Sequence, residues 1–150
     1  MYKTINKAVK TILTGKARTP DPVQWHITVT KGVHNTYKVH FTACIGQPWR
    51  LPSMSQQYHK NGGPAPTRLE FEKNDNIYLL NGPVEMGKLL ETFNGDNGAN
   101  FKYYKNSASF VQDVYVQHPT ETLKGHILYM PYTARKSMVQ KIKPFQIELD

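Results

Sequence analysis

The side chains that could carry chemistry begin with the single cysteine of this chain, Cys44. A thiol can attack a disulfide, but a second thiol must resolve the mixed disulfide that forms, so one cysteine cannot cycle between a dithiol and an internal disulfide. Cys44 follows Lys38, His40 and Thr42 in an alternating segment. No activating cluster surrounds it in the sequence, which favours a structural strand residue over a nucleophile or an intermolecular disulfide.

A pair of histidines, His26 and His40, is the second candidate. Each lies seven residues from Val33, so a hairpin centred on Val33 places the two opposite each other on its polar face. Such neighbours are about 5 Å apart at Cβ, close enough to share a metal ion. No carboxylate or third histidine joins them on that hairpin, and tight sites use three or four ligands. We therefore expect two solvated histidines and no metal.

Patterns of other common active sites are absent from the sequence. It contains no Ser/His/Asp arrangement, no glycine-rich phosphate loop and no metalloprotease helix motif. Glu70 and Glu72 alternate with apolar residues and so lie on one face of one strand, whereas a glycosidase needs two carboxylates across a cleft. We therefore predict that the chain is not an enzyme and holds no cofactor.

The segments that position these residues alternate with a period of two. Apolar residues occupy every second place over 25–29 and 37–45, with a turn at 31–35 between them. This pattern predicts two strands that each bury one face. The pairs expected opposite each other are Trp25 with Phe41, Ile27 with Val39, and Val29 with Tyr37. A slip of one residue would turn one apolar set outward.

Further short strands are predicted along the rest of the chain. The segments are 67–72, 77–80, 101–104, 109–116, 123–130 and 144–149, and the four Asn-Gly dipeptides at 61, 81, 94 and 97 are read as turns between strands. No segment of the body has a sustained helical period. Seven to nine strands of this kind predict an all-β chain folded as a two-sheet β-sandwich.

The charge of the chain divides it into a leader, residues 1–20, and a body, residues 21–150. The chain carries a formal net charge of +8; five of its 19 basic residues and none of its 11 acidic residues lie in the leader, so the body has 14 against 11, or +3. A body so balanced has no field that would favour nucleic acid. The leader is too interrupted by lysines for a good signal peptide, so we expect a flexible or short-helical segment, and no stretch is apolar enough to cross a membrane.

Four motifs of the body, in this order and spacing, resemble one protein family. The motifs are Asp21-Pro22-Val23-Gln24-Trp25, then Phe41-Thr42-Ala43-Cys44-Ile45 leading to Trp49-Arg50-Leu51, then Gly62-Gly63-Pro64-Ala65-Pro66-Thr67, and Gly125-His126-Ile127-Leu128-Tyr129-Met130. Over roughly residues 21–150 the chain resembles the N-terminal periplasmic domain of the thiol:disulfide interchange protein DsbD, the disulfide corrector domain. The resemblance implies an immunoglobulin-like β-sandwich in the periplasm or another secreted location.

The same resemblance implies where a redox site has been lost. Tyr132 and Ser137 stand at the positions of the family's two cysteines, and neither side chain can exchange with a disulfide. The cap loop that shields those cysteines would fall at residues 91–95, with Glu91 and Phe93 as its remnant. An alternative is that Phe93 is simply a loop aromatic packed on the sandwich.

These residues lead to a functional hypothesis. The chain would be a non-catalytic, disulfide-corrector-like domain that binds a protein partner in the cell envelope, between the Phe93 loop and residues 132–137. Trp49, Tyr132, Arg135 and Lys136 are the residues expected to contact that partner. The alternative is a carbohydrate-binding module that uses Trp49 and the loop tyrosines, since aromatic rings anchor recognition.

Overall fold

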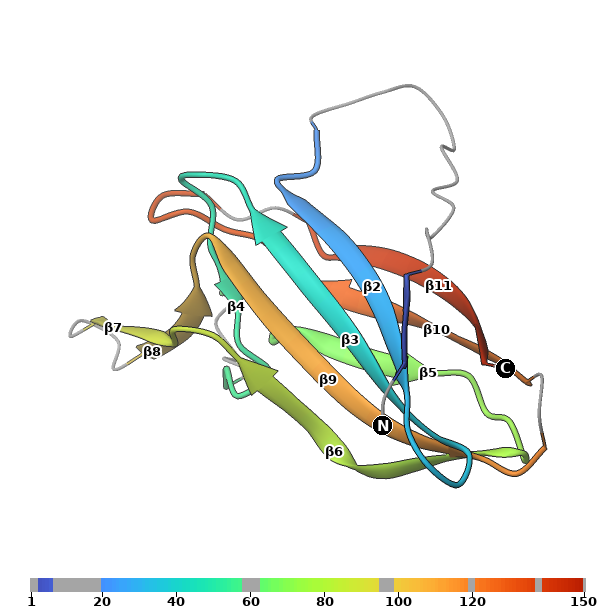
Figure 1. Ribbon diagram of the computed structural model, residues 1–150. Helices are drawn as coiled ribbons and strands as arrows, with labels where there is room; N and C mark the ends of the chain where they lie inside the picture. Colours follow the sequence, from blue (N-terminus) through green and yellow to red (C-terminus); the bar gives the residue numbers. More distant parts are fainter. Residues whose placement is uncertain are drawn as a thin grey trace.

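The computed structural model describes residues 3–6, 20–57, 63–94, 99–118, 121–136 and 139–149. Every regular element within these ranges is a β-strand, and the strands form three antiparallel sheets (Figure 1). The prediction of an all-β chain is confirmed.

The largest sheet has five strands in the order β1-β2-β3-β9-β6. Their bounds are Lys3–Asn6, Val23–Lys31, Thr36–Ile45, Ser107–Val116 and Ile77–Met86. The second sheet has the order β11-β10-β5, with the bounds Lys141–Leu149, Glu121–Tyr129 and Arg68–Phe71. These two sheets form the layers of a sandwich.

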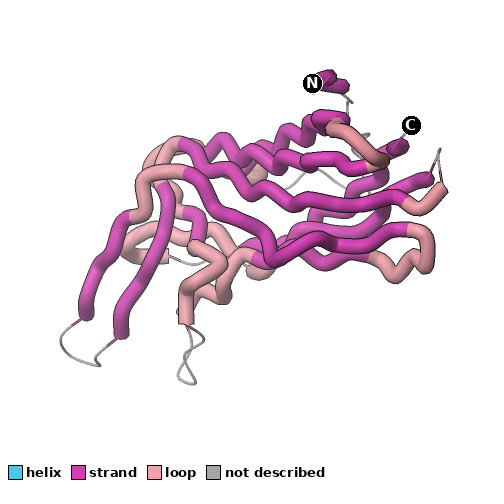
Figure 2. Tube along the Cα trace, turned by 60° about the horizontal axis from the view of Figure 1, so that its bottom comes forward, coloured by secondary structure: helices cyan, strands magenta, loops and turns pink. Residues whose placement is uncertain are grey.

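The third sheet is small and lies at one end of the sandwich. Its order is β4-β8-β7, with the bounds Leu51–Pro52, Ala99–Tyr104 and Leu90–Asn94. Figure 2 shows the β7–β8 hairpin projecting from the end of the two layers. This hairpin was not expected as such, because only 101–104 was predicted as a strand.

Apolar side chains fill the space between the two large sheets. Phe41 of β3 meets Phe145 of β11 with ring centroids 5.0 Å apart and Phe71 of β5 at 6.2 Å. Edge-to-face rings of this kind contribute beyond the area they bury. All five apolar residues predicted to face inward between 37 and 45 are buried, so the period-two interpretation of β3 is confirmed.

The register of the β2–β3 hairpin differs from the prediction by two residues. Trp25 pairs with Ala43, Ile27 with Phe41 and Val29 with Val39. The reason is the turn, in which His34 and Asn35 take positive φ angles of 55° and 59° and the amide of Thr36 donates to the carbonyl of Val33 at 3.2 Å. A shift of two keeps every side chain on its predicted face, so the hydrophobic pattern could not reveal it.

The same shift of register changes the expected positions of His26 and His40 relative to each other. His26 stands opposite Thr42, and His40 stands opposite Thr28, so the two histidines are not direct cross-strand neighbours and the geometry proposed for a shared metal ion is wrong. Burial lowers the pKa of His40, and the charge of Lys38 lowers it further. Over the described ranges no group of three or more His, Cys, Asp or Glu side chains could hold a metal ion.

Other strand boundaries also differ from the sequence prediction. Strand β6 runs through Asn81-Gly82, because Asn81 takes a φ of 63° inside an irregularity of the strand rather than in a hairpin turn. Four residues of the leader, Lys3–Asn6, pair with β2 as strand β1, so they are not part of a helix. Residues 7–19 lie outside the described residues.

Candidate protein-binding tip

The segment that follows β10 is tied to the residue that precedes β4. The amide of Arg50 donates to the carbonyl of Tyr132 at 2.7 Å, and the amide of Tyr132 donates to the carbonyl of Arg50 at 3.1 Å. This bridge joins positions far apart in sequence. We call the third sheet together with residues 131–136 the tip.

Tyr132 is a packed residue of the tip rather than an exposed one. Its side chain is 5% exposed, and its ring lies 6.2 Å from that of Phe101 and 6.0 Å from that of Tyr103, measured between centroids. The guanidinium of Arg50 lies 4.5 Å above the Tyr103 ring and 5.9 Å from that of Tyr132. A cation over aromatic faces in a partly desolvated site stabilises the arrangement.

The phenol of Tyr132 is held neutral by its surroundings. Burial raises its pKa, while the charge of Arg50 acts in the opposite direction. The hydroxyl is fully buried and has no hydrogen-bond partner among the described residues. Tyr132 therefore supports the tip through its ring. Ser137, the other position implied for the redox pair, lies outside the described residues.

Phe93 lies on strand β7 rather than in a loop. It pairs with Asn100, and its neighbour Thr92 pairs with Phe101. Its side chain is 70% exposed, so it is not packed on the sandwich. The hydroxyl groups of Thr92 and Tyr103 lie 2.9 Å apart. Strand β8 thus connects the strand that carries Phe93 to the ring of Tyr132.

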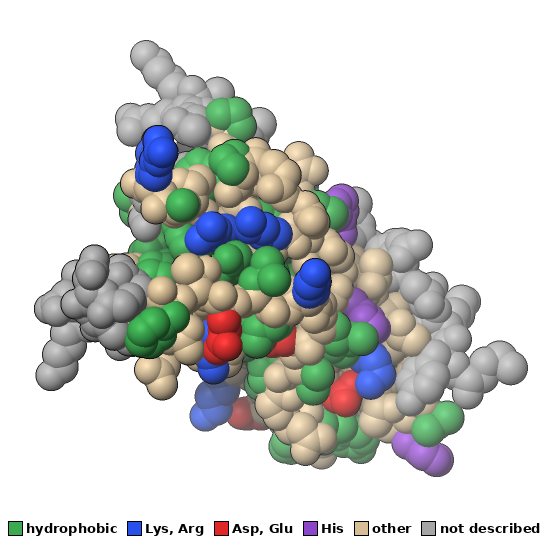
Figure 3. Space-filling view, turned by 90° about the vertical axis from the view of Figure 1, so that its left-hand side faces the viewer, with side chains coloured by type: hydrophobic (Ala, Val, Ile, Leu, Met, Phe, Trp, Pro, Cys, Tyr) green, Lys and Arg blue, Asp and Glu red, His purple; other side chains and the backbone are tan. Residues whose placement is uncertain are grey.

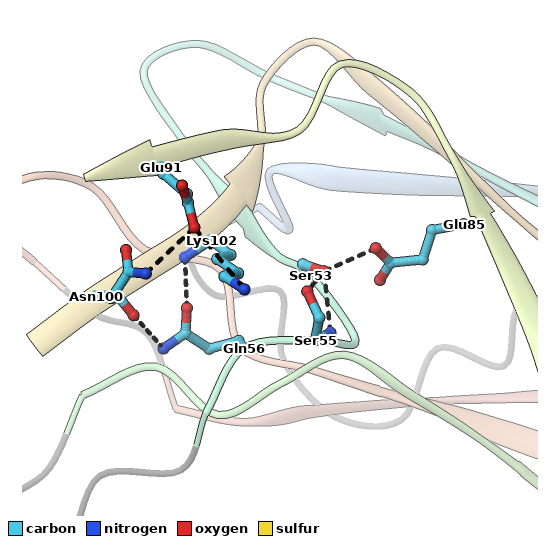
Figure 4. Close-up of polar contacts among 7 residues, drawn as sticks. All are labelled: Ser53, Ser55, Gln56, Glu85, Glu91, Asn100 and Lys102. Carbon is cyan, nitrogen blue, oxygen red and sulfur yellow. Dashed lines mark hydrogen bonds and ion pairs between the residues drawn. The ribbon is translucent and has the colours of Figure 1, made fainter. Parts of the chain in front are cut away.

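Glu91 has structural partners on the neighbouring strand. Its carboxylate accepts a hydrogen bond from the Asn100 side chain at 3.2 Å and lies 3.8 Å from the ammonium of Lys102 (Figure 4). Both partners belong to β8. Glu91 therefore joins the two strands of the hairpin.

Gln56 fixes the chain after β4 to the open side of β8. Its side-chain oxygen accepts from the amide of Lys102 at 2.6 Å, and its side-chain nitrogen donates to the carbonyl of Asn100 at 3.2 Å (Figure 4). The residue is buried. A buried amide that satisfies two main-chain groups in this way continues the ladder where strand β4 has ended.

A second polar cluster anchors the tip to strand β6. The Glu85 carboxylate accepts a hydrogen bond from the hydroxyl of Ser53 at 2.7 Å (Figure 4). It also accepts hydrogen bonds from the hydroxyl of Tyr104 at 2.7 Å and from the amide of Met54. Burial raises the pKa of Tyr104, and its hydrogen bond to Glu85 raises it further. Since Ser53 is fully buried, this cluster holds residues 53–54 against the sandwich.

Arg135 and Lys136 are presented by an ordered turn. The amide of Thr133 donates to the carbonyl of Lys136 at 2.6 Å, while the amides of Arg135 and Lys136 donate to the Thr133 hydroxyl at 3.2 and 3.0 Å. Both basic residues are exposed. On the face seen in Figure 3, basic side chains lie beside hydrophobic ones.

The aromatic residues expected to bind sugar are mostly built into the structure. Trp49 is half-buried and packs against the core. Tyr103, Tyr104, Tyr129 and Tyr132 are all buried. Tyr78 is 50% exposed on β6, and Tyr58 lies outside the described residues. The buried rings cannot form the stacking platform that a carbohydrate-binding module needs.

Cys44 lies near the end of β3, in the five-stranded sheet and not in the tip sheet. It stands opposite Gln24 on one side and Ser107 on the other, and it is an exposed free thiol. Its place on the outer, alternating face agrees with the structural interpretation. It does not belong to the group of residues around Tyr132.

The sequence indicated Trp49, Arg50 and Tyr132, but it did not indicate the polar residues that hold this part of the chain in place. Ser53, Gln56 and Glu85 carry no motif. The one available signal was that Glu85 is the sole charged residue between Ile77 and Met86, since a lone carboxylate in an apolar strand often has fixed partners. The partners themselves come from distant segments.

No protein-family model, curated protein or solved structure matches this chain. Among the described residues, no helix is long and apolar enough to cross a membrane.

Proposed function

We propose that the chain is a protein-binding domain that uses its tip to contact a partner and has no thiol–disulfide exchange activity of its own. The observation that carries this proposal is the contrast between two aromatic residues of the tip. Tyr132 is buried against Phe101 and Tyr103, whereas Phe93, two strands away, is 70% exposed. An exposed phenylalanine on a hairpin is the kind of residue that anchors interfaces.

The basic turn supplies the second part of the proposed surface. Arg135 and Lys136 are exposed on a turn that is ordered by three hydrogen bonds, one to a main-chain carbonyl and two to the Thr133 hydroxyl. An ordered turn loses little conformational freedom on binding, so its charges contribute more to recognition than those of a loose loop. The apolar anchor, Phe93, and the basic rim, Arg135 and Lys136, together suit a partner that presents an apolar residue flanked by acidic residues.

The finer parts of the proposal rest on the family resemblance. In this proposal the sandwich has the immunoglobulin-like arrangement of a disulfide corrector domain, works in the periplasm or another secreted location, and retains the docking end of its relatives without their cysteines. The absence of a second thiol supports the loss of exchange activity.

A capture experiment tests the binding surface. Immobilised chain would be incubated with cell-envelope extract, using the wild type, a tip variant with Phe93→Ser and Arg135→Glu, and the control Val33→Ser. Val33 is 58% exposed on the β2–β3 turn, at the opposite end of the sandwich from the tip (Figure 1). We expect a partner that the wild type and the control retain and the tip variant loses. Equal capture by all three chains would refute the proposed surface.

An insulin-reduction assay tests the absence of exchange chemistry. We expect no dithiol-dependent turnover from the wild type or from Cys44→Ser. Turnover by the wild type that disappears in Cys44→Ser would show that the single thiol is a working redox group and would overturn this part of the proposal.

A further inference from the structure

Strand β6 forms an open, apolar edge of the five-stranded sheet. It pairs with β9 on one side, and no described residue pairs with its other side. Five of its residues expose large hydrophobic side chains: Tyr78 at 50%, Leu79 at 47%, Leu80 at 37%, Val84 at 60% and Met86 at 57%. An open edge of this length and hydrophobicity invites pairing with another strand.

Charged residues do not guard this edge. Glu85 is the only charged residue between Ile77 and Met86, and its carboxylate is turned toward Ser53, Met54 and Tyr104. Natural proteins commonly place lysines on edges that must stay unpaired. On β6 the protective features are the irregularity between Leu80 and Val84 and, within it, Pro83, which has no N–H to donate.

The outer face of β6 follows from its pairing with β9. On one face of the pair, Tyr78 stands opposite Tyr115, Leu80 opposite Asp113, Val84 opposite Val111 and Met86 opposite Ser109. Of these β9 residues, Ser109, Asp113 and Tyr115 are half-buried and Val111 is covered. The alternate residues of β9, such as Phe110 and Val114, are buried in the core. Four of the five exposed apolar side chains therefore lie on one face.

That face is self-complementary about Gly82. If β6 pairs antiparallel with a second β6 on a two-fold axis at this glycine, Tyr78 stands opposite Met86 and Leu80 stands opposite Val84. Residues directly opposite each other in a pair of strands share a face, and this register meets that condition for both pairs. Each contact is apolar against apolar, with no like charges opposed.

Gly82 leaves room at the axis. A Cβ added to Gly82 would meet no atom within 4 Å, so a second main chain can approach there. The irregularity is held from the sandwich side, where the Gln112 amide donates to the carbonyls of Leu80 at 3.3 Å and Asn81 at 3.1 Å. These carbonyls are satisfied within one copy, so pairing need not supply their partners.

We propose that β6 pairs with β6 of a second copy of this chain and so joins the two five-stranded sheets into one. Ten residues of main chain and five large side chains from each copy can bury an area on the order of the 1,000 Å² that a biological interface needs. The interface is isologous, as in most two-fold dimers. None of the residues paired in this way belongs to the tip as defined above.

Molar mass in solution tests the proposal. Light scattering or sedimentation equilibrium over a wide range of concentration should show the wild type rising from 17.2 kDa to twice that mass. Val84→Lys should keep the monomer mass. The matched control is Val33→Lys, because Val33 is 58% exposed against 60% for Val84; it should dimerise like the wild type. A wild type that stays monomeric, or a Val84→Lys variant that dimerises unchanged, would overturn the proposal.

Cross-linking at the axis tests the register. In a Cys44→Ser background, Gly82→Cys places a thiol where each copy meets its own counterpart. Paired Cα atoms about 4.5–5.5 Å apart fall within disulfide range. Mild oxidation should convert Gly82→Cys, but not the control Val33→Cys, to a covalent dimer. Equal rates for both variants would contradict the proposed axis, and circular dichroism of each variant checks that it is folded.

Discussion

At the scale of single residues, the hydroxyl of Tyr132 gives the clearest prediction. It is buried without a hydrogen-bond partner among the described residues, so Tyr132→Phe removes a polar atom whose burial is unfavourable. We expect the free energy of unfolding to stay unchanged or to rise by up to about 1 kcal/mol, as measured by urea denaturation. Tyr132→Ala should instead lower it by about 3–5 kcal/mol, because the ring is lost.

The Tyr132 comparison distinguishes a structural ring from a functional hydroxyl. A loss of more than about 1 kcal/mol in Tyr132→Phe would mean that the hydroxyl has a partner in solution, since a neutral hydrogen bond contributes about that much. Tyr103→Phe is the matched control. Its hydroxyl lies 2.9 Å from that of Thr92, so removing it should cost about 0.5–1.5 kcal/mol.

Three buried tyrosines predict how stability depends on alkaline pH. Burial raises the pKa of Tyr104, Tyr129 and Tyr132, and hydrogen bonds to Glu85 and Asp21 raise the first two further. The unfolded state releases these protons near pH 10, while the folded state retains them. Stability is therefore complete below about pH 10 and falls as pH rises above it.

A spectrophotometric titration checks this pH dependence. The absorbance of ionised tyrosine should rise in two stages, and the second stage should belong to Tyr104, Tyr129 and Tyr132, which ionise only as the chain unfolds. Circular dichroism recorded in parallel should lose its β signal in the second stage. Ionisation of all nine tyrosines in one step without loss of structure would contradict the buried, neutral phenols.

At the scale of elements, the sequence predicted most of the strands and missed β1, β4 and β7. Strands β2, β3, β5, β8, β9, β10 and β11 each match a predicted segment within a few residues, and β6 begins at the predicted residue but runs on to Met86. Strand β7 has a weak pattern because Glu91, Thr92 and Phe93 are all exposed, so no buried face marks it. Strand β4 has two residues, too few for any period.

The predicted register of the β2–β3 hairpin and the predicted length of β6 were both wrong, for one physical reason. Asn35 in the turn and Asn81 in β6 both take the left-handed conformation, with φ angles of 59° and 63°. Asparagine enters that region both in turns and inside irregular strands. The Asn-Gly dipeptide at 81 therefore could not show whether the strand ends there in a turn or continues through an irregularity. Hydrophobic alternation fixes the face of a strand but not its partner, and a shift of two residues leaves the face unchanged.

The packing of β10 between its neighbours predicts a severe effect at Gly125. A Cβ there would lie 2.2 Å from the carbonyl oxygen of Glu70 and 2.7 Å from the Phe145 ring. Main chain cannot yield at that distance, so Gly125→Ala should lower the free energy of unfolding by at least about 3 kcal/mol, at or beyond the upper end for overpacking. Gly82→Ala, where a Cβ meets nothing within 4 Å, should change it by less than about 1 kcal/mol. Urea denaturation of both variants measures the two effects. An equal change in the free energy of unfolding at the two sites would contradict this packing.

At the scale of the whole molecule, the tip could not have been assembled from sequence alone. Arg50 and Tyr132 are brought together by a bridge across two separate sheets. Glu85 reaches Ser53 from another strand. Such contacts depend on how the sheets stack, and stacking leaves no local pattern. The sequence could group Tyr132 with Trp49 as partner-contact residues only through a family resemblance, whereas the burial of Tyr132 and the exposure of Phe93 follow from the three-dimensional arrangement.

The division into leader and body predicts the behaviour of a shortened chain. Every residue of the buried core lies between Val23 and Leu149, and Asp21, the partner of the Tyr129 hydroxyl, also lies beyond the leader. Deleting residues 1–19 removes strand β1, whose four residues pair only with the outer side of β2. The deletion removes the hydrogen bonds of β1, but it also removes the loss of conformational entropy that ordering β1 costs on folding. The free energy of unfolding should therefore fall by less than about 2 kcal/mol.

The same deletion locates the charge of the molecule. The leader holds five of the basic residues and no acidic one, so the chain's net charge falls from +8 to +3 when it is removed. We therefore expect the full chain to bind heparin or DNA weakly at low salt, as measured by fluorescence anisotropy, and the shortened chain to lose this binding. The binding depends on the release of counterions and not on a shaped site. Cooperative unfolding by urea should be retained. Undiminished polyanion binding would mean that the balanced charges of the body form a basic surface after all, and the tip with Arg135 and Lys136 would be the first place to look for it.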